Sequence, residues 1–186
     1  MPDNSCPELF TDVDMKVPNT DVAWKKSGRR WTLMKCMDGW ELFQRPGDIF
    51  VCMKFFQTEF GANRSTAQNT CTKNEAKLSG VANRKKSEWM EKQAEYLNTG
   101  AWDGAWLDGV RSCDASEPNC HNYIWSDGFT SGNDAFGGNL WSPNHTATVQ
   151  SCLTALSILS GYQRLNAVSC EKYDRAVGVI CGYQLK

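Results

Sequence analysis

Hydrophobic residues occur in short runs along most of the chain, and glycine, proline or asparagine separates one run from the next. Two such runs fill residues 39–56 and flank a turn at Pro46-Gly47, which predicts a β-hairpin. Residues 1–35 show neither a helical nor an alternating pattern. We therefore expect an N-terminal extension over residues 1–35, as a tail or a wrapping segment, and one folded domain over residues 36–186.

Two helices are predicted after this hairpin. The first covers residues 62–80, with Asn63 or Ser65 as N-cap and Gly80 at its end. Its inward stripe is expected to consist of Ala67, Cys71 and Leu78. The second covers residues 83–97, and its buried face should carry Met90, Ala94 and Leu97.

Strands follow the helices. The phrase Trp-x-Asp-Gly occurs twice in apolar surroundings, at Trp106 and at Trp125. Two further apolar runs, at residues 152–159 and 176–183, are typical of closing strands. A hairpin, two helices and then several strands indicate an α+β domain.

A long segment rich in glycine and asparagine begins at Thr130 and has no periodicity, which is typical of a functional loop. Trp102 and Trp141 border this loop, and Trp141 either packs in the core or contacts a ligand. Three other tryptophans fall in predicted strands and are expected in the core: Trp40, Trp106 and Trp125.

Charge and hydropathy limit the classes of partner. Lysine plus arginine (20) nearly balance aspartate plus glutamate (21), so no strong overall field attracts nucleic acid or an anionic membrane. The basic cluster Lys25–Arg30 is interpreted as solvated surface, with a processing site or a patch for an anionic partner as alternatives. We expect no membrane span, because no apolar run approaches about 20 residues, and no signal peptide in the first ten residues.

The cysteines indicate an oxidising compartment. The chain has nine, without a Cys-x-x-Cys pair, and neither His121 nor His145 has a cysteine at metal-ligand spacing. Two N-glycosylation sequons, at Asn63 and Asn144, favour the same compartment. We therefore predict a secreted, extracellular glycoprotein.

Several phrases, taken in order, resemble the C-type lectin-like domain, in particular its secreted invertebrate, nematode-type, long-form members. "CMDGWELF" followed by "VC" resembles the family's N-terminal hairpin, and "AWLDG" resembles its Trp-Ile-Gly-Leu strand. "LWSPN" stands at the Glu-Pro-Asn loop and "RLNAVSC" at the Trp-Asn-Asp motif before cysteine. The resemblance covers residues 36–183 and implies a disulfide-stabilised fold with two helices packed on antiparallel sheets.

The resemblance also implies a disulfide pattern, which sequence alone leaves undetermined because eight cysteines allow 105 connectivities. The implied bridges are Cys71–Cys181, Cys152–Cys170 and Cys36–Cys52, which leaves Cys113 and Cys120 as a local pair. Cys6 is the ninth. It is either free or bonded to a partner, such as a second copy in a disulfide-linked dimer.

Calcium-dependent relatives hold one ion at the long loop, and the resemblance identifies the corresponding positions here. They are Ser142, Asn144, Gln150, Asn166 and Ala167, with Pro143 implied in a cis bond and Trp141 beside it. These positions carry no carboxylate, and Ca²⁺ affinity falls as carboxylates are lost. Asp127 and Asp134 are nearby acids whose spacing does not mark them as ligands. We expect no metal or other cofactor.

Two functions remain open. One is a calcium-independent recognition module whose loop, residues 130–150, binds an extracellular protein or another non-sugar surface. The other is a lectin that binds glycans through Asn144, Gln150 and Asn166, with calcium absent or weakly held. The resemblance adds a role in innate immunity or at an extracellular surface. An enzyme is not expected, because Asp108 and Asp127 occupy turns where aspartate usually caps the backbone.

Overall fold

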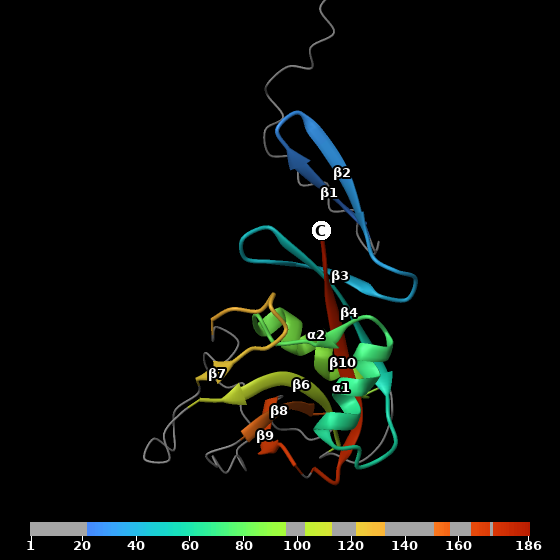
Figure 1. The fold of residues 1–186 in the computed structure, drawn as a ribbon, viewed down its shortest axis with the longest axis vertical. Helices are drawn as coiled ribbons and strands as arrows, with labels where there is room; N and C mark the ends of the chain where they lie inside the picture. Colours follow the sequence, from blue (N-terminus) through green and yellow to red (C-terminus); the bar gives the residue numbers. More distant parts are fainter. Residues whose placement is uncertain (1–21, 96–102, 113–121, 133–150, 157–164, 172) are drawn as a thin grey trace, which may run out of the picture.

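The computed structural model describes residues 22–95, 103–112, 122–132, 151–156, 165–171 and 173–186 (Figure 1). In chain order the elements are β1 (Val22–Ser27), β2 (Arg30–Lys35), β3 (Glu41–Arg45), β4 (Ile49–Gln57), α1 (Arg64–Lys73), β5 (Lys77–Leu78), α2 (Arg84–Glu95), β6 (Gly104–Arg111), β7 (Tyr123–Ile124), β8 (Ser151–Leu156), β9 (Leu165–Ser169) and β10 (Ala176–Leu185). Among the described residues, neither helix has the length and hydropathy needed to cross a membrane.

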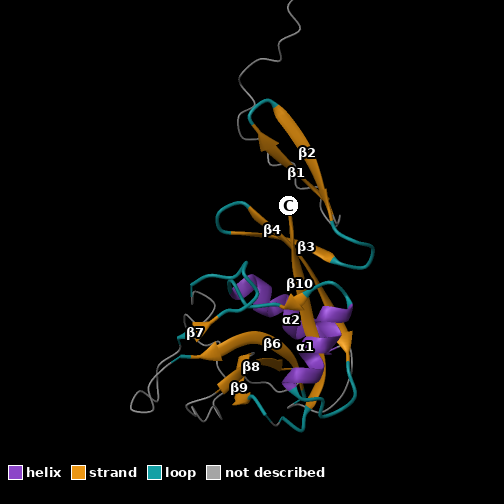
Figure 2. Ribbon diagram, viewed as in Figure 1, coloured by secondary structure: helices purple, strands orange, loops and turns teal. Residues whose placement is uncertain are grey.

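One sheet organises the molecule (Figure 2). Its strand order is β3-β4-β10-β6-β8-β9, with β5 paired to β10 and β7 paired to β6. Every pairing is antiparallel except that of β10 with β6, which is parallel and departs from the expected antiparallel pattern. The expected hairpin is confirmed as β3–β4, with a three-residue turn between Arg45 and Ile49.

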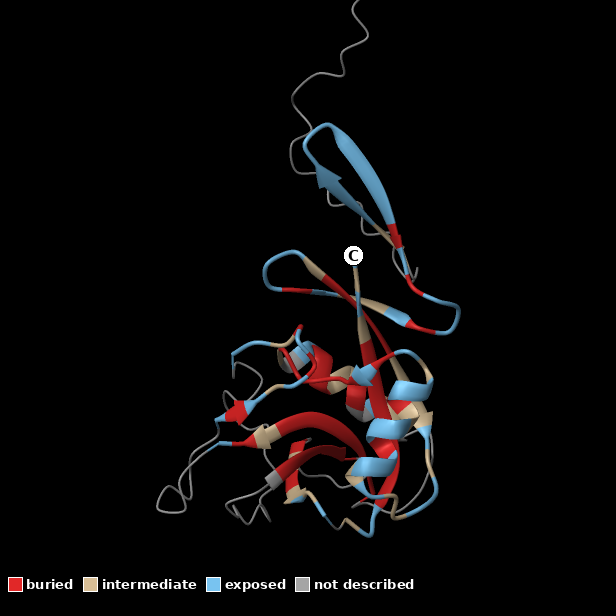
Figure 3. Cartoon of the chain, viewed as in Figure 1, coloured by how far each residue is buried: buried red, intermediate tan, exposed pale blue. Residues whose placement is uncertain are grey.

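The sheet divides the core into two halves, because successive side chains of a strand point to opposite faces. In β4, Val51 and Met53 join one cluster with Met90 of α2. Cys52, between them, joins the other cluster, which contains Ala67 and Cys71 of α1. Each helix therefore covers one half of the core, and Figure 3 shows the buried residues of the strands in red.

Helix α1 begins as expected and ends early. The side chain of Asn63 accepts a hydrogen bond from the Thr66 amide at 2.8 Å, which confirms it as N-cap. The helix stops at Asn74, and Glu75 follows with a φ of 55°. The prediction that Gly80 ends this helix is wrong, because Leu78 instead pairs with Cys181 as part of β5.

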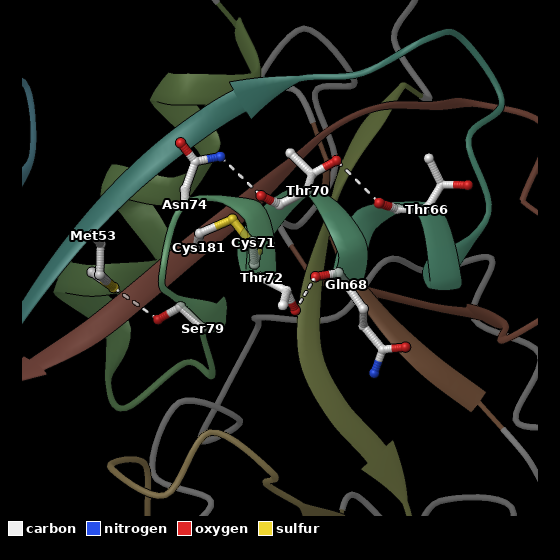
Figure 4. Close-up of a disulfide and its surroundings, with 9 residues drawn as sticks. All are labelled: Met53, Thr66, Gln68, Thr70, Cys71, Thr72, Asn74, Ser79 and Cys181. Carbon is white, nitrogen blue, oxygen red and sulfur yellow. Dashed lines mark hydrogen bonds between the residues drawn. A yellow bond between two sulfur atoms is a disulfide. The ribbon is translucent and has the colours of Figure 1, made fainter.

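Polar side chains of α1 bond back to its own carbonyls, while its inner face is linked to the sheet (Figure 4). Thr70, for example, donates to the Thr66 carbonyl at 3.0 Å. On the opposite side of the helix, Cys71 is bonded to Cys181 of β10. Ala67 is buried beside it, so these two members of the predicted stripe are confirmed.

The second helix is confirmed with slightly shorter bounds. Asn83 precedes α2, and its side chain accepts a hydrogen bond from the Lys86 amide at 3.2 Å. Met90 is fully buried, as predicted. The side chain of Ala94 is not described, and Leu97 lies outside the described residues.

Three disulfides confirm the pattern implied by the resemblance. They join Cys36 to Cys52, Cys71 to Cys181, and Cys152 to Cys170. Cys6, Cys113 and Cys120 lie outside the described residues, so the pairing of the last two stays a prediction.

Residues 22–35, for which no regular element was expected, form the antiparallel hairpin β1–β2. Its two-residue loop is Gly28-Arg29, and Gly28 has a φ of +60°, as the first position of a type II′ turn requires. Only the base of the hairpin is buried, at Met34 (Figure 3). The alternation was missed because the strands are rich in charge and their apolar residues do not face the core.

The tryptophans follow their predicted positions in part. Trp40 and Trp106 are buried in the core, as expected. Trp125 follows β7 and is half-buried against the core. Trp102 and Trp141 lie outside the described residues.

Candidate functional site

The structure describes the chain up to residue 132, within the predicted long loop, and again from β8. Of the six predicted ligand-binding residues, Asn166 is described, on β9. The other five lie outside the described residues, namely Trp141, Ser142, Pro143, Asn144 and Gln150. What the structure describes is the framework from which this loop starts and to which it returns.

Asn166 takes part in an internal hydrogen-bond group. It lies opposite Thr154 of β8, and the side chains of both residues hydrogen-bond with the Tyr173 hydroxyl. Burial raises the pKa of Tyr173 to about 12, with these hydrogen bonds opposing the rise. The Tyr173 ring also packs edge-on against Trp106, with ring centroids 5.9 Å apart. Asn166 therefore holds β8, β9 and Tyr173 together.

Ala167 occupies the position of the aspartate in the Trp-Asn-Asp motif. It lies opposite Leu153 and is only 6% exposed. A methyl group offers no oxygen to a cation, and an oxygen donor is what Ca²⁺ requires. At this position the structure provides apolar packing between β8 and β9.

The start of the long loop is held by Asp127, which is 2% exposed. One carboxylate oxygen accepts hydrogen bonds from the amides of Phe129 and Thr130, at 2.9 and 2.8 Å. The other accepts from the Gly80 amide at 2.8 Å and from the Thr130 hydroxyl. We call residues 125–132, which this aspartate shapes, the anchor segment.

Arg45 neutralises Asp127 from the end of β3. Its guanidinium lies 3.8 Å from the carboxylate, donates to the Thr130 hydroxyl, and donates to the Gly80 carbonyl at 2.9 Å. Burial lowers the pKa of Arg45 to about 10, and the Asp127 charge opposes that fall. Arg45 therefore stays charged at neutral pH, and the buried charge is paired.

Asp108, from the first Trp-x-Asp-Gly phrase, fixes the second phrase. Its carboxylate accepts hydrogen bonds from the amides of Ser126 and Asp127 and from the Ser126 hydroxyl at 2.8 Å. Arg64 of α1 lies 3.3 Å away and balances the charge. Burial lowers the pKa of Arg64, and Asp108 opposes this. The Asp108 carboxylate therefore links the two Trp-x-Asp-Gly phrases.

Close packing leaves no space for side chains at two glycines beside the anchor segment. A Cβ on Gly80 would lie 2.7 Å from Trp125 and from the Thr130 hydroxyl. Gly109, with a φ of +112°, would place a Cβ 2.8 Å from the Trp125 ring. The anchor segment therefore packs directly against the backbone at Gly80 and Gly109. The Trp125 indole also donates a hydrogen bond to the Gly132 carbonyl at 2.9 Å.

The buried carboxylates of Asp108 and Asp127 are already committed to these structural bonds. Asp127, considered as a nearby acid for calcium, has both oxygens occupied. Asp134 lies outside the described residues. Within the described ranges, no group of three or more histidine, cysteine, aspartate or glutamate side chains could hold a metal ion. The described donor set does not fit calcium.

Asp108 and Asp127 were also the candidate acid–base pair among the described residues. Asp127 caps the backbone two and three residues ahead, as predicted, whereas Asp108 caps residues 126 and 127 across the sheet. Both are saturated with hydrogen bonds, so neither has the lone pairs that a general base needs. His121 lies outside the described residues.

Sequence reasoning missed the arginines of this framework. Arg45 precedes the Pro46-Gly47 turn and Arg64 follows the sequon asparagine Asn63, and neither local pattern assigns a role to the arginine. The repeated Trp-x-Asp-Gly phrase was the available signal, since a buried aspartate requires a paired cation. Which arginine supplies that cation depends on the packing of β3 and α1 against the sheet, which local patterns do not contain.

Comparisons with known proteins identify the fold independently. Residues 61–182 match the family model for the lectin C-type domain. No curated protein sequence matches the chain significantly.

Solved structures with the same fold share little sequence with this chain. The carbohydrate-recognition domain of cow CD23, solved in the presence of a GlcNAc2Man3 oligosaccharide, is 19% identical, with a TM-score of 0.52 over 82% of this chain and 98% of that one. Herring type II antifreeze protein is 19% identical, with a TM-score of 0.53 over 81% and 100%. The Ca²⁺-independent C-type lectin SPL-2 from Saxidomus purpuratus is 20% identical, with a TM-score of 0.52 over 80% and 93%.

Proposed function

Since the chain belongs to the family of lectin C-type domains, we propose that it is a calcium-independent recognition module. Its long loop, residues 130–150, would bind an extracellular protein or another non-sugar surface. The observation that carries the proposal is Ala167, a buried methyl group on β9 at the position of the family's aspartate. Recognition modules of this kind are binding domains, so no reaction is assigned.

The chemistry of the loop supports independence from calcium. The remaining motif positions, Ser142, Asn144, Gln150 and Asn166, offer hydroxyl and amide oxygens without formal charge. Removing water from a divalent cation is costly, and uncharged dipoles compensate poorly for the missing carboxylates. Asn166 is also hydrogen-bonded to Tyr173, so calcium would compete with the bonds that hold β8 to β9.

Fixed loop ends support a role in recognition. Asp127 and Arg45 hold the start of the loop, and the Cys152–Cys170 bridge joins β8 to the segment after β9. Binding residues on a loop gain precision when a rigid scaffold positions both ends. The buried pair of Arg45 and Asp127 belongs to this framework.

A glycan-binding lectin is the second candidate. Its specific support is the Asn144 and Asn166 pair, which keeps amide groups at two motif positions. SPL-2, described as a Ca²⁺-independent C-type lectin, shares the fold. The innate-immune or extracellular-surface role implied by the resemblance applies to either candidate.

Calcium-linked thermal unfolding tests the main claim. A site with a dissociation constant of about 10 µM would gain about 2.7 kcal/mol of stability at about 1 mM calcium. We expect no change in melting temperature between calcium and a chelator. A calcium-dependent rise that is lost in Asn166→Ala would contradict the proposal.

A restored site provides the matched positive case. Ser142→Glu combined with Ala167→Asp supplies two carboxylates, and Ser142→Gln with Ala167→Asn is the neutral control. We expect calcium to stabilise the first variant and not the second.

A glycan array with and without chelator then separates the two candidates. Glycan binding that persists in chelator and requires Asn166 would favour the lectin. Absence of binding to any glycan on the array would favour a protein ligand.

We further propose secretion and N-glycosylation. Three disulfides are stable in an oxidising compartment. Asn63 is exposed, and its side-chain oxygen caps α1. A glycan on the side-chain nitrogen would leave that oxygen free to cap. Mass spectrometry after glycosidase treatment of secreted protein tests whether Asn63 and Asn144 carry glycans.

Cys6 is either free or bonded to a partner. Non-reducing electrophoresis of the wild type beside Cys6→Ser tests whether it forms an intermolecular disulfide.

A further inference from the structure

The β1–β2 hairpin exposes one apolar face. Trp24 lies directly opposite Leu33, and Trp31 lies opposite Lys26, so the three apolar side chains share one face of the two-stranded ribbon. Their side chains are exposed by 41% for Trp24, 45% for Trp31 and 47% for Leu33. Figure 1 shows the hairpin extending beyond the main sheet, at the end of the molecule away from β8 and β9.

The hairpin is also strongly basic. Residues 22–35 contain no acidic residue and five exposed basic ones, namely Lys25, Lys26, Arg29, Arg30 and Lys35. Lys35 is partnered by Asp38 at 3.7 Å, in a pair exposed to solvent. The balanced charge of the whole chain therefore hides a local concentration of positive charge, and the expectation of no attraction to anionic membranes does not apply to this segment.

This arrangement calls for an external occupant. An isolated two-stranded hairpin is marginally stable in water, and Trp24 and Trp31 keep 41% and 45% of their surface in water without a partner. The Cys36–Cys52 bridge and buried Met34 fix its base to β4, which leaves the tip projecting. A second copy of the same hairpin is a poor occupant, because it would bring five like charges against five.

We propose that the β1–β2 hairpin docks on anionic lipid surfaces. Lys26, which shares the apolar face, and Arg29, in the turn, would contact lipid phosphates and carboxylates, each adding about a fivefold gain in binding. Trp24 and Trp31 would sit at the headgroup level, where amphipathic indole rings are favoured. A sulfated glycan would satisfy the charges and stack on the indole rings, but it offers no hydrocarbon region for Leu33. The lipid surface satisfies both properties.

Vesicle co-sedimentation tests this with the full chain. Vesicles of phosphatidylcholine with about 30% phosphatidylserine should bind the protein, and binding should fall at high salt as the Debye length shortens from about 10 Å towards 3 Å. Vesicles of phosphatidylcholine alone should bind far less. Equal binding to both compositions would overturn the proposal, as would capture by heparin without sedimentation on the anionic vesicles.

Two variants separate the contributions of charge and apolar contact. Lys26→Gln/Arg29→Gln should weaken binding about 25-fold, and Lys73→Gln/Lys92→Gln, which removes exposed charges elsewhere, is its control. Trp24→Thr/Trp31→Thr should weaken binding at least about tenfold while keeping residues that favour strands. Phe60→Ser, at a ring that is 65% exposed outside the hairpin, is the matched aromatic control.

The Lys26→Gln/Arg29→Gln variant keeps the proposal testable if the tryptophan variant loses the hairpin, because both replaced side chains are exposed to solvent. Anionic-vesicle binding unchanged in Lys26→Gln/Arg29→Gln would overturn the proposal. This test does not involve the long loop, so its outcome is independent of which ligand that loop binds.

Discussion

The β1–β2 and β3–β4 hairpins follow one another in the chain, and each turns over a glycine with positive φ. Gly28 has a φ of +60° and Gly47 a φ of +75°, and a Cβ on either would meet no atom within 4 Å. The local structure is therefore similar. What separates them is burial, since β4 is buried from Phe50 to Met53 and half-buried over most of its remaining length, whereas β1 and β2 are exposed except at their base.

The difference shows how the same motif acquires two roles. In β3–β4 the aromatic and cationic side chains face other elements, as when Arg45 lies 5.0 Å from the Phe129 ring inside the core. In β1–β2 the similar pair of Lys26 and Trp31, 5.8 Å apart, faces solvent. A buried contact stabilises the fold, and an exposed one is left for a partner.

The largest expected contrast is between two tryptophans. Trp40 is 4% exposed and packs edge-on against Phe56 and Tyr183. Trp40→Ala should lower the free energy of unfolding by about 3–5 kcal/mol. Trp31→Ala, in the exposed hairpin, should change it by less than about 0.5 kcal/mol. Urea unfolding of both variants checks this, and similar losses would remove the distinction between the hairpins.

The Cys36–Cys52 bridge ties the base of the exposed hairpin to the buried one across a sequence separation of 16. Replacing both cysteines by alanine should cost about 3 kcal/mol in the chain-entropy model. Calorimetry measures the loss, and amide exchange in residues 22–35 should rise more than in β4. Unchanged exchange in the outer hairpin would mean that the bridge does not hold its base.

The turn glycines give a matched pair. Alanine at a left-handed backbone position costs about 1–2 kcal/mol. Gly47→Ala should therefore lower the global unfolding free energy by about that amount, because the β3–β4 turn is part of the cooperative sheet. Gly28→Ala should leave the global melt unchanged and abolish amide protection in β1–β2 alone. A global effect from Gly28→Ala would show that the outer hairpin unfolds together with the domain.

The smallest effect is expected at Lys26. Its exposed contact with Trp31 is screened by water, so Lys26→Gln should change the unfolding free energy by less than about 0.5 kcal/mol. Thermal melting of this variant beside the wild type provides the check. A larger loss would show that the charge stabilises the fold and is not reserved for a ligand.

Much of the fold was predictable because its signals are local. The Pro46-Gly47 pair predicts the β3–β4 turn, and Asn63 is a typical N-cap. The end of α1 was not predictable, because Leu78 lies at helical spacing from Cys71. Lys77 and Leu78 nevertheless form β5, since they pair with β10. Tertiary hydrogen bonds overrode local preference there.

The candidate site was predictable only in its chemistry. The loss of the motif aspartate is visible at Ala167 in the sequence alone. The bonds from Tyr173 to Thr154 and Asn166 are not, because Tyr173 belongs to a different segment and meets β8 and β9 only in the fold. The roles of Arg45 and Arg64 were missed for the same reason.

The sequence by itself determined the family resemblance, the three confirmed disulfide pairs that this resemblance implied, and the uncharged donor set of the loop. These depend on residue identity and order. Only the tertiary structure decided which charges are buried and paired, and that one basic hairpin remains outside the core. Burial is a property of packing between distant segments, and the short-range pattern of hydrophobic and polar positions does not record it.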